Sequence, residues 1–129
     1  MSIAVAYSDT PRGAAALHAA AEEAVLRGKN LAVLNIIPGA DQVEHNDPAV
    51  EVKVTDQLAG IEGLTWSLHT APEEFDTAEA LLDLAEEVDA TLLAIGSRHR
   101  TRVGKLLLGS TVQRVLLEST IPVLVIKTT

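Results

Sequence analysis

The sequence contains no cysteine and very few aromatic residues. Without cysteine, the chain can form neither a disulfide framework nor a thiolate zinc site. Aromatic residues make up 2% of the 129 residues, as Tyr7, Trp66 and Phe75, although 47% of the chain is hydrophobic. Alanine, leucine, valine and isoleucine must therefore fill the core, and this composition suits helices packed on a buried parallel sheet.

Long hydrophobic runs are also missing. No apolar run approaches the roughly 18 residues that a membrane-spanning helix needs. The first ten residues lack the basic start and the apolar stretch of a signal peptide. We therefore expect a single domain over residues 1–129 that acts in the cytoplasm without a membrane partner.

Positive charge is scarce in the first 95 residues, which hold four basic and 17 acidic side chains and so carry −13, whereas Gly96 to Thr129 carries +5. The net charge of −8 repels phosphate over long distances, so we expect no nucleic-acid partner. A basic segment on an acidic body is compatible with a small anion bound locally. It is equally compatible with a solvated loop that contains Arg98, Arg100 and Arg102.

Hydrophobic periodicity divides the chain into alternating strands and helices. Strands are predicted at Ile3–Tyr7, Leu31–Ile37, Leu64–His69, Thr91–Ile95 and Pro122–Ile126. Helices are predicted at Ala14–Leu26, at Pro48–Leu58, from Asp76 to about Val88, and at Ser110–Leu117. Alternation of this kind predicts an α/β fold in which right-handed crossovers build an open five-stranded parallel sheet with helices on both faces.

Two strands carry the signals of a sheet edge. Leu64–His69 alternates apolar and polar residues, which indicates a strand that is covered less well than the others. Pro122 starts the last strand, and proline has no N–H to donate to a neighbouring strand. Edges at the third and fifth strands predict the strand order 3-2-1-4-5. Ligands bind such sheets beyond the carboxyl ends of the first and fourth strands, where the winding reverses.

The segment from Gly96 to Ser110 follows the fourth strand and holds four of the ten basic residues of the chain. Gly96 ends the strand at a point where the backbone can approach a ligand closely. Gly109-Ser110-Thr111 opens the last helix, with Gln113 as the expected capping partner of Ser110. The amides and the dipole of such a helix start favour a bound anion, although a purely structural cap would use the same residues.

The stretch LLAIGSRHRTRVGKLLLGSTVQRVLLESTIPVLVIK resembles the universal stress protein family, and the resemblance extends along the whole chain. Nucleotide-binding members of this family show G-x2-G-x9-G-[ST] between the fourth strand and the last helix. Gly96, position 99 and Gly109-Ser110 fall at this spacing. The chain departs from the family pattern at His99, which replaces the middle glycine, and at Ser8, which replaces an aspartate after the first strand.

The resemblance implies a site for ATP or AMP, with or without Mg²⁺. Ala6 and Ile36 would contact the adenine, and Ser8, Ile95 and Gly96 would surround the ribose. The phosphates would meet His99, Gly109, Ser110 and Thr111, and Arg98 and the neighbouring basic side chains would replace the backbone bonds that a glycine at position 99 would allow.

The sequence therefore predicts a non-catalytic universal stress protein that binds an adenine nucleotide and forms a homodimer through Pro122–Ile126. One alternative is an interaction module of the same family that has lost nucleotide binding, which the residues at positions 8 and 99 favour. A second alternative is a weak ATP hydrolase. No metal site is expected, because the four histidines lack ligand spacing.

Overall fold

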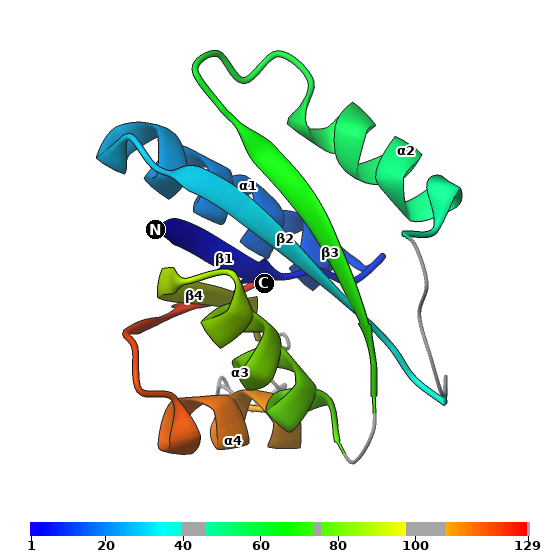
Figure 1. The fold of residues 1–129 in the computed structure, drawn as a ribbon, viewed down its shortest axis with the longest axis vertical. Helices are drawn as coiled ribbons and strands as arrows, with labels where there is room; N and C mark the ends of the chain where they lie inside the picture. Colours follow the sequence, from blue (N-terminus) through cyan, green and yellow to red (C-terminus); the bar gives the residue numbers. More distant parts are fainter. Residues whose placement is uncertain (40–45, 74–75, 98–107, 129) are drawn as a thin grey trace.

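The computed structural model describes residues 1–39, 46–73, 76–97 and 108–128 of the chain. Strands and helices alternate along these residues (Figure 1). The strands are β1 (Ser2–Ala6), β2 (Asn30–Ile37), β3 (Trp66–Pro72), β4 (Ala90–Gly96) and β5 (Val123–Ile126). The helices are α1 (Pro11–Arg27), α2 (Pro48–Leu58), α3 (Thr77–Glu87) and α4 (Ser110–Glu118).

The strands form one sheet in the order β3-β2-β1-β4-β5, and every neighbouring pair is parallel. This confirms the predicted topology, including both edges. β1 lies at the centre, where it pairs with β2 through Ala6 and Leu34 and with β4 through Val5 and Ala94. The winding of the chain reverses between β1 and β4, so their carboxyl ends define the switch point of the sheet.

The two faces of the sheet carry separate hydrophobic cores, because side chains alternate along a strand. Ile3 and Val5 of β1 face the core that α1 and α2 cover, whereas Ala4 faces the core under α3 and α4. In Figure 1, α1 lies behind the sheet and α3 in front of it. Both cores consist largely of aliphatic side chains, as the scarcity of aromatic residues requires.

Side chains cap the first three helices. Thr10 accepts a hydrogen bond from the Gly13 amide at α1, Asp47 from the Ala49 amide at α2, and Asp76 from the Glu79 amide at α3. The expected start of α1 at Ala14 is wrong by almost one turn. Helix α1 begins at Pro11, since proline fits the first helical position, where no internal N–H bond is lost.

The third strand also differs from its prediction. Leu64 and Thr65 lie outside the strand, which instead continues to Pro72 because β3 pairs with β2 in register from Leu31 opposite Trp66 to Ile37 opposite Pro72. β5 begins one residue later than predicted, at Val123. No helix among the described residues is long and apolar enough to cross a membrane.

Candidate functional site

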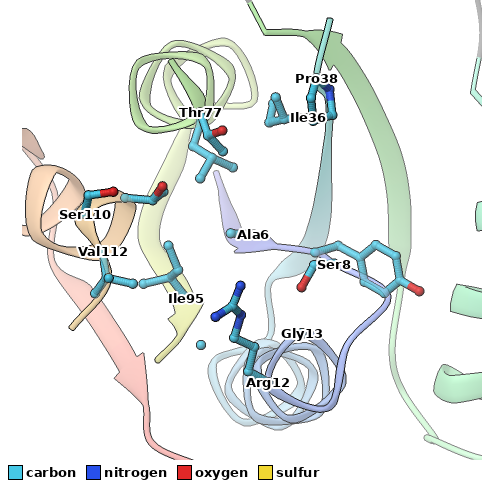
Figure 2. A pocket seen from close by; sticks show the side chains of 15 residues that line it. Ala6, Ser8, Arg12, Gly13, Ile36, Pro38, Thr77, Ile95, Ser110 and Val112 are labelled. Carbon is cyan, nitrogen blue, oxygen red and sulfur yellow. The ribbon is translucent and has the colours of Figure 1, made fainter. Parts of the chain in front are cut away.

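A cavity of about 360 Å³ opens at the switch point, within the size range of small-molecule sites (Figure 2). It lies over the carboxyl ends of β1 and β4 and between the first turns of α1 and α4. Its walls come from five parts of the chain far apart in sequence. The lining residues are Ala6, Tyr7, Ser8, Arg12, Gly13, Ile36, Pro38, Thr77, Leu81, Ile95, Gly96, Gly109, Ser110, Thr111 and Val112.

Eight of the ten residues predicted from the sequence line this cavity. They are Ala6, Ser8, Ile36, Ile95, Gly96, Gly109, Ser110 and Thr111. The other two, Arg98 and His99, lie outside the described residues. Arg100, Arg102 and Lys105 of the predicted basic loop also lie outside the described residues.

Helix α4 presents its first turn to the cavity without a side-chain cap. Gly109, and not Ser110, is the N-cap residue, and glycine has no side chain to accept from the helix amides. Gln113 donates to the carbonyl of Leu108 at 3.0 Å, so the predicted pairing of Gln113 with Ser110 is wrong. Among the described residues no side chain accepts from the first amides of α4, and this first turn lines the cavity. Such amides, together with the helix dipole, attract an anion.

The turn between β1 and α1 forms another wall and is bonded internally. The hydroxyls of Ser8 and Thr10 lie 2.8 Å apart, and the Thr10 hydroxyl also accepts from the Gly13 amide at 3.1 Å. Gly13 is required here by close contact: a β-carbon at this position would lie 2.0 Å from the carbonyl oxygen of Ser8. The first turn of α1 is therefore pressed directly against the end of β1.

Gly96 has a similar role at the end of β4. A β-carbon there would lie 2.5 Å from the backbone carbonyl oxygen of Arg12. The sequence predicted that Gly96 allows close approach of a ligand. Gly96 does line the cavity, but the close approach in the structure is to the backbone of α1. The absence of a side chain at Gly96 therefore lets the backbone of Arg12 pack directly against the end of β4.

Asp9 takes no part in the cavity, although it stands next to the position where the family pattern has an aspartate. Its carboxylate forms an ion pair and hydrogen bond with Lys53 of α2, and this bond raises the pKa of the Lys53 amine. Asp9 therefore does not replace the missing carboxylate at Ser8. The lining contains no acidic residue, and Arg12 is its one charged side chain among the described residues.

The described histidines do not line the cavity. His18 lies 3.0 Å from the carbonyl oxygen of Gln57, and His69 lies 2.8 Å from the hydroxyl of Ser67. Within the part of the chain that the structure describes, no group of three histidine, cysteine, aspartate or glutamate side chains is placed to hold a metal ion.

Sequence reasoning missed several lining residues, of which Arg12, Pro38 and Thr77 are the most informative. Pro11 was the available signal for Arg12, because a proline at the first helical position puts the next residue in the first turn beside the strand end. Pro38 directly follows the second strand. Thr77 approaches the cavity only through the tertiary packing of α3, and no local pattern marks it.

An open parallel sheet with a cavity at its switch point and an uncapped helix facing that cavity defines a class: α/β proteins that hold a small ligand at the carboxyl ends of their strands. The comparisons identify the family within that class. The sequence model of the universal stress protein family matches residues 1–127. A universal stress protein of Mycolicibacterium smegmatis is 42% identical over 127 residues, which cover 97% of this chain and 96% of the relative. The chain belongs to the universal stress protein family.

Solved structures of the family share the fold. A universal stress protein from Archaeoglobus fulgidus has 31% sequence identity and a TM-score of 0.78, with 98% of each chain covered. A structure of the universal stress protein from Archaeoglobus fulgidus in complex with dAMP has 29% identity and a TM-score of 0.72, again with 98% of each chain covered. The predicted α/β fold with an open parallel sheet is thus confirmed by independent structures.

Proposed function

We propose that this protein binds an adenine nucleotide, AMP or ATP, in the switch-point cavity. The observation that carries the proposal is the first turn of α4, which lines a cavity of about 360 Å³ and has no side-chain cap among the described residues. Phosphate is the group that such a helix start binds best. The relative from Archaeoglobus fulgidus that was solved with dAMP supports the choice of an adenine nucleotide.

The remaining walls suit the other parts of a nucleotide. Ile36 and Pro38 form an apolar side of the cavity, opposite the Ser110 side (Figure 2). A flat adenine ring has an apolar surface to bury there, beside Ala6 at the end of β1. The sugar then lies between the two sides, near Ile95 and the hydroxyl of Ser8.

The described lining favours binding over catalysis. Hydrolysis of ATP needs a group that orients or deprotonates water, and carboxylates and imidazoles usually serve this role. Neither group lines the cavity among the described residues. Serine and threonine hydroxyls without a carboxylate also make a poor Mg²⁺ site, since Mg²⁺ is usually held by carboxylates and phosphates. We therefore assign no step to a metal ion.

A homodimer through β5 is the second part of the proposal. β5 has a neighbour on one side only, and its residues Val123 to Ile126 are all half-buried and apolar. An apolar edge of this kind is prone to pair with another strand. A second copy of the chain offers the same edge, and pairing the two would cover both.

Isothermal titration calorimetry of the full chain with AMP, ATP and adenosine tests nucleotide binding. We expect saturable binding of AMP and ATP, and weaker binding of adenosine, which lacks the phosphate that α4 receives. Repeating the AMP titration in EDTA should leave its affinity unchanged. A folded protein that shows no saturable signal up to millimolar nucleotide contradicts the proposal and favours the interaction module. Release of ADP in proportion to protein would instead favour a hydrolase.

A further inference from the structure

The side chain of Arg12 is directed into the cavity from the first turn of α1. Figure 2 shows its guanidinium group between Ile95 and Ser8, pointing toward the centre of the cavity. No carboxylate of the described residues lies within ion-pairing distance of this group. A guanidinium group without a protein counter-ion, at the wall of a ligand cavity, is suited to a bidentate contact with phosphate.

The backbone of Arg12 is held in place on both sides. Its carbonyl group occupies the space that a side chain at position 96 would fill, and the next residue, Gly13, packs in the same way on Ser8. Pro11 fixes the backbone just before it. The backbone of Arg12 is therefore fixed beside the end of β4, and its side chain reaches the cavity from there.

The position of the Arg12 side chain corresponds to one edge of a nucleotide bound in the cavity. With the base against Ile36 and the phosphate at Ser110, the sugar bridges the two sides, and its remaining edge carries the 2′ and 3′ positions. This edge faces the third side of the cavity, where Ser8 and Arg12 lie (Figure 2). In doubly wound folds, an acidic side chain near the ribose binds free hydroxyls, whereas an arginine accommodates a phosphate on the ribose.

We propose that Arg12 is a specificity-determining residue that selects adenine nucleotides with a second phosphate on the 2′ or 3′ position of the ribose. The inference rests on the proposed function, because it assumes that a nucleotide occupies the cavity. Ser8 contributes by being neutral: a carboxylate at this position would repel the second phosphate. The first phosphate binds at α4 and the second at Arg12, on two sides of the same cavity.

The test compares ligands that differ only in the second phosphate. Calorimetric titration of the full chain should show that adenosine 2′,5′-bisphosphate or adenosine 3′,5′-bisphosphate binds about tenfold more tightly than 5′-AMP, as one charge-assisted bidentate contact allows. Arg12→Gln should remove this advantage and change the affinity for 5′-AMP by less than about threefold. Ser8→Asp should reverse the preference, so that 5′-AMP binds more tightly than either bisphosphate.

Arg27→Gln is the matched control, since Arg27 lies in the last turn of the same helix and pairs with Glu23. It should keep the preference for a bisphosphate, which shows that the net charge of the protein does not cause it. Equal affinities for 5′-AMP and both bisphosphates in the wild-type chain would overturn the inference and leave the proposed function in place. Retention of the preference in Arg12→Gln would overturn it as well. A folded chain that binds none of the three ligands would reject both proposals.

Discussion

The two helices whose first turns face the cavity begin in opposite ways. At α1, the Thr10 hydroxyl accepts from the Gly13 amide, and Pro11 has no amide hydrogen to satisfy. At α4, Gly109 supplies no side chain, and no described side chain accepts from the first amides. The first helix start is capped by a side chain of the protein, whereas no described side chain caps the second.

The difference distinguishes the two contacts that we propose for phosphate in one cavity. Helix α1 contributes a charged side chain, Arg12, from a turn that is already fixed by hydrogen bonds and close packing. Helix α4 contributes backbone amides and its dipole. Helices α2 and α3 begin with the aspartate caps Asp47 and Asp76. Among the described helices, therefore, the only start without a side-chain cap is one that faces the cavity.

The largest effect is expected where α1 presses on β1. Gly13→Ala should lower the free energy of unfolding by about 2–3 kcal/mol, because the new β-carbon would lie 2.0 Å from the Ser8 carbonyl oxygen and force the turn apart. Urea denaturation measures this loss. Alanine is otherwise the better helix former by about 1 kcal/mol, so an unchanged or more stable variant would refute the close packing.

Ala14→Gly is the control for helix propensity at the neighbouring position. Ala14 is half-buried in the same turn. Its replacement should cost only about 1 kcal/mol, the usual difference between glycine and alanine in a helix.

Giving α4 a cap removes the contrast between the two helices. Gly109 has φ −66° and ψ 164°, a conformation that any N-cap residue adopts. Gly109→Asp should stabilise the protein by a few tenths of a kcal/mol, because the carboxylate accepts from the helix amides. The same carboxylate should weaken AMP binding about tenfold or more, since it occupies those amides and repels phosphate. Titration calorimetry and urea denaturation measure the two effects.

Gly109→Ala is the matched variant, because it adds a side chain without a carboxylate. It should keep most of the affinity for AMP. Undiminished AMP affinity in Gly109→Asp would show that the phosphate does not bind at α4.

The contrast between the caps also predicts unequal effects of two alanine substitutions. Thr10→Ala removes the cap of α1 and should cost about 1 kcal/mol in unfolding free energy. Ser110→Ala should cost less than about 0.5 kcal/mol, because Ser110 is inside the helix and caps nothing. Thermal denaturation of both variants at one pH checks this order. A larger loss in Ser110→Ala would restore the serine as the functional cap.

The strand order was predictable because both edge strands carry a physical signature in the sequence. Pro122 lacks a donor, and the alternation around Trp66 marks a half-exposed strand, so only a few orders of five strands remain. The ends of β3 were not predictable in the same way. Its pairing with β2 extends the strand to Pro72, and that pairing depends on tertiary register and not on local pattern.

The cavity was predictable where residues stand at strand ends or helix starts, as Ala6, Ile95 and Ser110 do. Arg12 was missed because the predicted helix began at Ala14, although Pro11 was available as the signal of an earlier start. The structure selects Thr10, which brings Arg12 into the first turn. This turn also packs closely on Gly96, 84 residues away in sequence, and no local pattern records that contact.

The smallest expected effect on the free energy of unfolding concerns Asp76, the charged N-cap of α3. The amide of Glu79, and then Arg114, hold the pKa of Asp76 below its usual value. Because the pKa is lower in the folded state, the contribution of Asp76 to stability is present above about pH 4 and disappears as the pH falls through the folded pKa.

Asp76→Asn keeps a good N-cap without the charge. The difference in unfolding free energy between the two proteins should therefore be largest near neutral pH and vanish at about pH 2, as measured by urea denaturation at several pH values. A difference that persists unchanged at low pH would show that the cap acts through its shape and hydrogen bond alone. In that case the charge of a cap would have no part in the contrast between α3 and the open start of α4.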